Sequence, residues 1–184
     1  MRITLITGLM IAAVPATIQA AVVTIGSSNA HLCYESARRS VARGEDIAFC
    51  DAALEENLMA RDRAATFVNR GVLRIRAKEH DLALADFESA IAVDETLGEA
   101  YLNKGVALLD VDDDGAVAAL TKALVLKPER PQLAHFGLAA AFENKGDLRR
   151  AYREYRAAAE LDPRWSVPRA ELRRFRVAGT EGQH

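Results

Sequence analysis

The amino-acid sequence predicts an all-α fold built from consecutive antiparallel helical pairs. Its apolar residues make up 50% of the chain and are largely Ala, Leu and Val, whereas a β-rich chain would carry more aromatic and β-branched residues. Residues 138–163 alternate small and aromatic residues on both sides of a Lys145–Asp147 turn and end at Pro163. The same order recurs upstream, so we interpret this stretch as one unit of a repeat array.

The N-terminal stretch, residues 1–20, has the features of a secretory signal peptide. Arg2 is its only charged residue, and the apolar run over residues 3–14 is too short to span a bilayer. Small residues follow, and we expect cleavage between Ala20 and Ala21, with a cut after Ala16 or an uncleaved N-terminal anchor as alternatives. The protein is therefore expected to be periplasmic or secreted, with no stable membrane span after cleavage.

The two cysteines lie in a predicted helical hairpin that follows a flexible N-terminus over residues 21–28. Helices are expected over residues 29–41 and 46–59, and the first should bury a stripe that includes Leu32. Antiparallel packing of the two helices places Cys33 opposite Cys50. In an oxidising compartment this predicts a structural disulfide worth roughly 3 kcal/mol, and two free buried thiols are the alternative.

From Ala64 onward, small residues, aromatic residues and exit prolines recur in three consecutive units. The units are 64–97, 98–130 and 131–164. Residues with these roles are Gly71, Gly105 and Ala139 on first helices, Ala83, Ala116 and Ala151 on second helices, Phe87 and Tyr155 between units, and Pro128 and Pro163 at exits. This pattern resembles the tetratricopeptide repeat (TPR) family. The resemblance implies an α-α superhelix, or solenoid, of about three and a half hairpins in which residues 29–63 form a degenerate first hairpin.

The C-terminal residues 165–184 are expected to close the open end of this array. Pro168 can begin a helix, and Leu172, Phe175 and Val177 give it a partial apolar stripe among arginines. We therefore predict a capping helix, followed by a disordered tail over residues 180–184.

The resemblance also implies a concave groove lined by the first helix of each repeat. The residues expected to line it are Val68, Val72, Ile75, Leu102, Asn103, Val106, Leu109, Leu133 and Phe136. Only Asn103 matches the clamp with which chaperone-binding members of the family hold a C-terminal carboxylate. Two interpretations stay open: the groove receives an apolar partner segment, or a terminal segment or second copy of the chain covers it.

An acidic stretch over residues 110–115 resembles the first half of a calcium-binding loop. Its carboxylates alternate before Gly115, but Thr121 occupies the place of the bidentate glutamate. The repeat register makes this segment a turn before a helix, where negative charge is favourable. We therefore expect no metal site, and keep a small-ligand or calcium-binding protein as the alternative function.

The remaining features argue against catalysis and nucleic-acid binding. No two of His31, His80, His135 and His184 have metal-ligand spacing, and no cofactor is implied. Acidic residues prevail over 79–114 and basic ones over 145–176, which favours solvated helix faces and leaves self-association through the two ends as an alternative. The sequence thus predicts an exported, non-enzymatic scaffold or adaptor for a protein or peptide partner in the cell envelope.

Overall fold

The computed structural model describes residues 2–5, 20–24, 28–39 and 45–178. Within these ranges it contains nine helices and two short strands. The helices are α1 (Ser28–Arg38), α2 (Asp46–Leu54), α3 (Ala60–Arg76), α4 (His80–Val93), α5 (Gly98–Ala107), α6 (Asp113–Val125), α7 (Pro131–Asn144), α8 (Leu148–Leu161) and α9 (Ser166–Leu172), and the strands are β1 (Arg2–Leu5) and β2 (Phe175–Ala178). Most of the predicted signal peptide falls outside the described residues.

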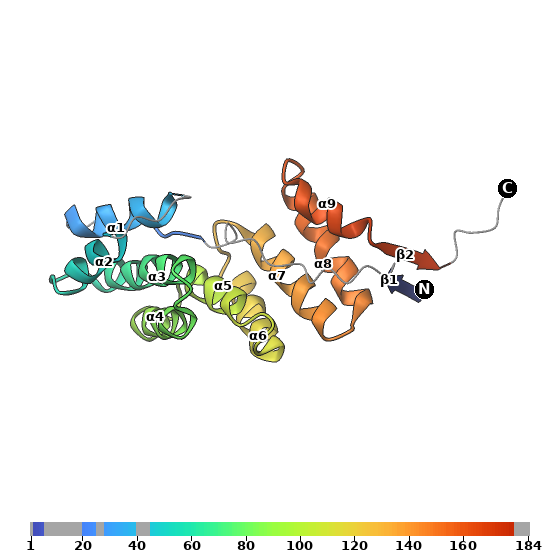
Figure 1. Ribbon diagram of the computed structural model, residues 1–184, viewed down its shortest axis with the longest axis horizontal. Coiled ribbons are helices and arrows are strands. Elements are labelled where there is room, and N and C mark those ends of the chain that lie inside the picture. The colour runs from blue at the N-terminus through green and yellow to red at the C-terminus, as the bar shows by residue number, and fades with distance from the viewer. Residues whose placement is uncertain (1, 6–19, 25–27, 40–44, 179–184) are drawn as a thin grey trace.

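The helices pack as sequential hairpins that stack along one axis (Figure 1). Each of the pairs α1–α2, α3–α4, α5–α6 and α7–α8 packs together, and each hairpin also packs against the next. First helices of neighbouring hairpins touch, since α3 contacts α5 and α5 contacts α7. The predicted all-α, TPR-like superhelix is confirmed.

Close approach within each hairpin depends on small residues. A Cβ built on Gly71 would lie 2.4 Å from a ring carbon of Phe87, and one on Gly105 would lie 2.6 Å from Leu120 Cγ. The alanines expected to oppose them on second helices are fully buried, namely Ala83, Ala116 and Ala151. A larger side chain at these positions would separate the two helices and lose the dispersion contacts between them.

The first hairpin carries the predicted disulfide. Cys33 in α1 and Cys50 in α2 are joined, with a Cα–Cα distance of 4.8 Å, and both are fully buried. Leu32, expected in the buried stripe, is instead 40% exposed, and Ala30 takes part in the core in its place.

Arginines of α3 fix the ends of the two helices before it. Arg63 donates to the carbonyl oxygens of Leu54 and Glu56, at 3.0 and 2.8 Å. These bonds satisfy carbonyls that a longer helix would use, so α2 ends at Leu54 rather than near residue 59. Arg76 likewise donates to the carbonyl oxygens of Ala37, in the last turn of α1, and of Arg39, just after it, both at 2.6 Å.

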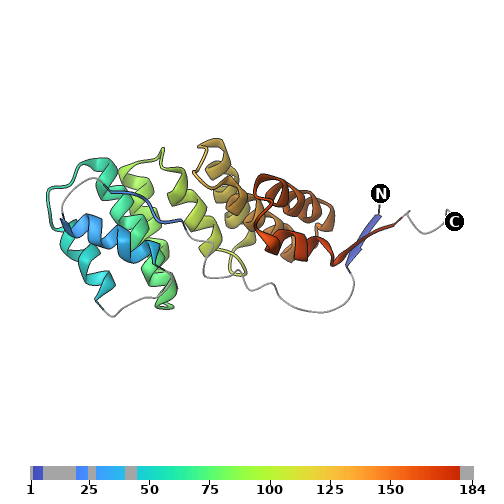
Figure 2. The same ribbon diagram turned by 90° about the horizontal axis from the view of Figure 1, so that it is seen from above.

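The C-terminal end differs from the expected capping helix. A helix does form after Trp165, but α9 ends at Leu172, and residues 175–178 form strand β2, which pairs antiparallel with β1 (Figure 2). Phe175 is buried because its ring packs against Tyr152 and Tyr155, at centroid distances of 5.8 and 5.9 Å. Aromatic packing thus directs the chain away from the helical path. The predicted disorder of residues 180–184 falls outside the described residues.

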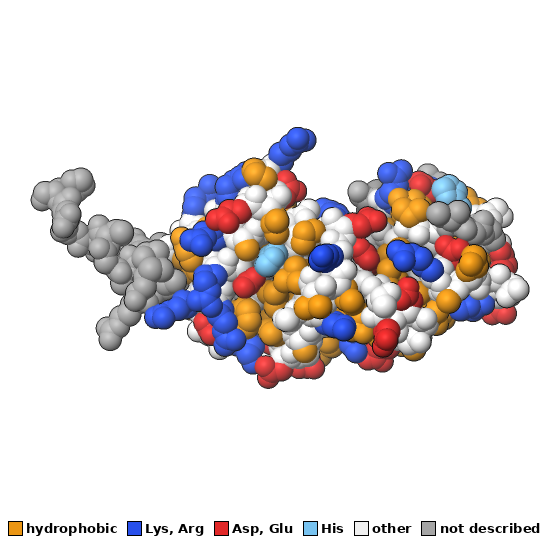
Figure 3. All heavy atoms as spheres, turned by 180° about the vertical axis from the view of Figure 1, so that it is seen from behind, with side chains coloured by type: hydrophobic (Ala, Val, Ile, Leu, Met, Phe, Trp, Pro, Cys, Tyr) orange, Lys and Arg blue, Asp and Glu red, His pale blue; other side chains and the backbone are white. Residues whose placement is uncertain are grey.

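Charge is unevenly distributed along the stack. On the face shown in Figure 3, Lys and Arg side chains gather towards the end that carries α8 and α9. Some of this charge is paired locally, as between Arg174 and the carboxylates of Glu143 and Glu171. Of the described helices, none is both long enough and apolar enough to cross a membrane.

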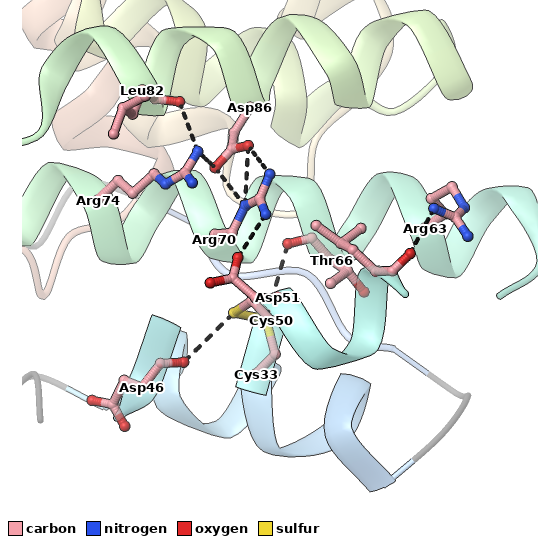
Figure 4. A network of polar contacts seen from close by, with 11 residues as sticks. Cys33, Asp46, Cys50, Asp51, Arg63, Thr66, Arg70, Arg74, Leu82 and Asp86 are labelled. Atoms are coloured by element: carbon pink, nitrogen blue, oxygen red, sulfur yellow. Dashed lines mark hydrogen bonds and ion pairs between the residues drawn. A yellow bond between two sulfur atoms is a disulfide. The ribbon is translucent and has the colours of Figure 1, made fainter. Parts of the chain in front are cut away.

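An ion-pair network joins three helices beside the disulfide (Figure 4). Asp86 in α4, only 2% exposed, accepts from Arg70 at 2.7 Å and from Arg74 at 2.8 Å, and both arginines lie in α3. Arg70 also pairs with the exposed Asp51 of α2 at 2.7 Å. Charge-assisted bonds therefore fix the register of α3 against both neighbouring helices.

Candidate protein-binding face

Two buried asparagines mark the face formed by α3 and α5. Asn69 lies in α3 and Asn103 in α5, at the same position of consecutive repeats. Both are fully buried. A buried carboxamide is costly unless its donor and acceptor are both satisfied, so their partners define what this face holds.

Each asparagine holds one residue of an extended segment from the N-terminal part of the same chain. Asn103 Oδ1 accepts from the Ala20 N–H at 3.0 Å, and Asn103 Nδ2 donates to the Ala20 carbonyl at 2.9 Å. Asn69 makes the same two bonds with the N–H and carbonyl of Val22, both at 2.7 Å. We call Ala20–Thr24 the N-terminal segment, and Asn69 with Asn103 the asparagine pair.

The geometry follows from the extended conformation of the segment. Residues two apart in an extended chain present their backbone groups on the same side and lie about 6.6 Å apart. Ala20 and Val22 can therefore meet asparagines on adjacent first helices. The segment runs from α5 towards α3, opposite to the order of the repeats, as the blue trace in Figure 2 shows.

Side chains of the segment are also accommodated. Ala20 is 6% exposed and belongs to the core cluster that contains Leu102 and Val106. Val22 packs at the edge of the neighbouring cluster, and Val23 points outward with 53% exposure. Thr24 is buried, and its hydroxyl donates to the carbonyl of Ala30 at 2.7 Å. Of residues 21–28, which are expected to be flexible, the structure places 21–24 in this extended segment and residue 28 in α1, and residues 25–27 lie outside the described residues.

The third repeat offers no corresponding amide. Gly137 occupies the position of Asn103 in the next repeat and has no side chain to hold a peptide backbone. A Cβ there would lie 2.9 Å from Leu120 Cδ1, so the Leu120 side chain of α6 already occupies the space beside Gly137. Among the described residues, the asparagine pair therefore bonds the backbone of the N-terminal segment at two positions, Ala20 and Val22.

The residues predicted to line the groove are mostly in the core between helices. Ile75 is half-buried, and the others are buried, namely Val68, Val72, Leu102, Asn103, Val106, Leu109, Leu133 and Phe136. Their arrangement supports the interpretation in which a terminal segment covers this face, because Ala20 joins the cluster of Leu102 and Val106.

Asn69 is the site residue that sequence reasoning missed. The available signal was its spacing of one repeat length from Asn103, which places both in one register of the repeat. The carboxylate clamp of the TPR family matches Asn103 alone, so it gives no reason to pair Asn103 with the amide one repeat earlier.

The carboxylates of the acidic turn over residues 110–115 bond to other groups of the same chain. Asp112 caps α6 by accepting from the Gly115 N–H at 2.9 Å, and Asp113 accepts from the N–H of Asp110 at 3.3 Å. Asn144 donates to both Asp110 and Asp113, and Lys145 pairs with Asp114. Over the described residues, no group of three or more His, Cys, Asp or Glu is placed to hold a metal ion.

The histidine on the first helix of the third repeat is engaged as well. His135 Nδ1 lies 2.7 Å from Glu154 Oε2 of α8, and both side chains are about a quarter exposed. This pair links the two helices of one hairpin. Among the described residues it belongs to no group of three or more His, Cys, Asp or Glu side chains that could hold a metal ion.

Fold and face together define a TPR-like helical-repeat protein that holds an extended peptide segment across two repeats. Three solved structures share this fold. They are the TPR domain of Arabidopsis OM64 (TM-score 0.60, 19% identity, 63% of this chain and 96% of that one), MamA (0.59, 19%, 69% and 72%) and YrrB (0.55, 23%, 70% and 64%). No protein-family description and no curated protein matches the sequence. At these identities the similarity establishes the fold alone.

Proposed function

We propose that this protein is an exported scaffold that binds an extended segment of a partner protein across α3 and α5. The observation that carries the proposal is the asparagine pair, which makes four hydrogen bonds to the backbone of two alternate residues. Such contacts recognise the backbone of an extended chain. Any preference for particular side chains would come from the hydrophobic clusters around Ala20 and Val22. YrrB, one of the similar structures, is described as a TPR protein with an unusual peptide-binding site, and a comparable role fits this chain.

The small side chain at Ala20 indicates the kind of segment that would fit. Ala20 is buried, so the partner residue opposite Asn103 should be Ala, Gly or Ser. Val22, held by Asn69, lies at an edge where a β-branched residue is accommodated. The proposed partner segment is therefore extended, uncharged and small at its first recognised position.

Selection from a displayed peptide library, with the full chain as the target, tests this proposal. Peptides selected by the unaltered protein should lose binding at least ten-fold with Asn69→Asp plus Asn103→Asp, because a carboxylate keeps the acceptor but cannot donate to the partner carbonyl. Asn144→Asp is the matched control, since Asn144 is exposed and bonds only to the acidic turn among the described residues. Equal binding by the double variant and the control would refute a role for the asparagine pair.

Export is the second part of the proposal. It is supported by the apolar N-terminal run and by the buried disulfide, which suits an oxidising compartment. Expression with the natural N-terminus in a Gram-negative bacterium, followed by mass spectrometry of the periplasmic fraction, should give a chain that starts at Ala21 and contains no free thiol. An uncut, reduced chain in the cytosolic fraction would contradict export.

A further inference from the structure

We infer that the N-terminal segment is an internal occupant of the binding face, which an incoming partner segment displaces in the same register. The inference rests on the proposed function, because it assigns regulation to the same asparagine pair. Its basis is that both carboxamide oxygens and both carboxamide nitrogens of the pair already bond to the backbone of Ala20 and Val22. In the uncleaved chain, a partner backbone can reach these atoms only after the segment leaves.

The attachment of the segment is suited to displacement. Its polar contacts with the face are those of the two asparagines, whereas the Thr24 hydroxyl bonds to Ala30 of α1 and Val23 remains exposed. Extended partner residues would offer the same N–H and carbonyl groups, so the exchange replaces each hydrogen bond with an equivalent one. The outcome depends on effective concentration, which favours the tethered segment until the partner is abundant or binds more strongly.

Signal cleavage would alter this competition. A cut between Ala20 and Ala21 removes the residue held by Asn103 and leaves Val22 on Asn69. The α5 half of the face would then be open, while the α3 half would remain occupied. Partner binding would begin at Asn103 and proceed towards Asn69.

The test uses the uncleaved full-length protein, produced without export so that Ala20 is retained, with proline substitutions confined to the segment. Ala20→Pro plus Val22→Pro removes both N–H donors to the asparagine pair and leaves the helices unchanged. Val23→Pro is the matched control, because Val23 is exposed and proline favours the extended backbone already present at Val22. Far-UV circular dichroism verifies that all three proteins are folded.

The probe is a fluorescent peptide with the sequence of residues 18–25, acetylated and amidated at its ends. We expect the Ala20→Pro, Val22→Pro protein to bind it at least ten-fold more tightly than the unaltered chain and the Val23→Pro control. The same peptide with proline in place of Ala20 and Val22 should not bind. Equal affinity for all three proteins would overturn the inference and leave the proposed function standing, whereas no binding to any of them would overturn both.

A second measurement needs no variant. Amide hydrogen exchange of the unaltered chain should show protection at Ala20 and Val22, and saturating probe should abolish it while α3 and α5 stay protected. Protection at these two amides that does not respond to bound probe would also overturn displacement.

Discussion

Gly105 of α5 lies so close to Leu120 of α6 that an added Cβ would come within 2.6 Å of Leu120 Cγ and 3.1 Å of its backbone nitrogen. Gly137 of α7 meets the same leucine from the other side, but only through its side chain, the nearest atom being a methyl at 2.9 Å. The buried Leu120 side chain therefore lies between α5 and α7, and it leaves little room for a side chain at either glycine.

Gly105→Ala should destabilise the protein, and Gly137→Ala should do so less. Alanine gains up to about 1 kcal/mol of helix propensity over glycine, but overpacking at Gly105 costs about 1–3 kcal/mol because Leu120 cannot move its Cγ or backbone. At Gly137 only flexible methyl groups must shift. Chemical denaturation of both variants measures the difference, and equal stabilities would show that the α5–α6 approach is not limiting.

Loss of Asp86 should cost about 3 kcal/mol of unfolding free energy. Its removal leaves Arg70 and Arg74, each 16% exposed, without their shared carboxylate. Asp51→Ala is the control: this residue is 53% exposed, and Arg70 would keep Asp86, so a loss below about 1 kcal/mol is expected. Denaturant titration of the two variants separates the buried contact from the exposed one, and similar losses would contradict this assignment.

Opening the Cys33–Cys50 disulfide should destabilise the protein by roughly 3 kcal/mol, as expected for its 17-residue separation. Thermal unfolding with and without reductant measures the effect. The Cys33→Ala, Cys50→Ala variant should melt at a lower temperature and show no response to reductant. A fully reduced unaltered chain that melts at the original temperature would disprove a stabilising role.

The contribution of Asp147 should depend on pH. Asp147 caps α8, and its bonds with the Arg150 N–H and side chain hold the pKa of its carboxyl below the ordinary value. A lowered folded-state pKa means that the stabilisation is complete above the ordinary value of about 3.9 and is lost as pH falls through the lower one. Asp147→Ala should therefore cost about 1 kcal/mol near pH 7 and progressively less below about pH 4.

Asp147→Asn is the control for this titration, because the amide oxygen can still cap the helix and does not ionise. Its stability near pH 7 should lie between those of the unaltered chain and Asp147→Ala. Urea midpoints measured from pH 7 to pH 3 follow all three proteins. A difference between the unaltered chain and Asp147→Ala that stays constant to pH 3 would exclude the carboxylate as its source.

The repeat fold could be predicted because its requirements are local in sequence. Gly71, Gly105 and the buried alanines recur at a fixed period, and each must be small for the same geometric reason. The disulfide was predictable for a similar reason, since antiparallel helices joined by a short turn place Cys33 opposite Cys50. These are contacts between neighbouring elements, whose positions follow from helix geometry.

The binding face and the C-terminal end depend on contacts between distant residues, and the sequence pattern did not show them. Ala20 meets Asn103 across 83 residues, and nothing in its own surroundings distinguishes it from the preceding small residues. Phe175 has a helix-compatible spacing from Leu172, but two tyrosines of α8 bind its ring and a strand begins there. Such outcomes require knowledge of the packed surface.

The 83-residue separation between Ala20 and Asn103 also orders events in time. This contact can close only after α5 has formed and packed on α3, so the bond after Ala20 stays accessible until that part of the chain has been made. Once the contact closes, the same bond lies within a hydrogen-bonded backbone, and a peptidase would need local opening to reach it. For the cleavage proposed above, a cut made before the contact closes would meet a free chain, whereas a later cut would first require Ala20 to leave Asn103.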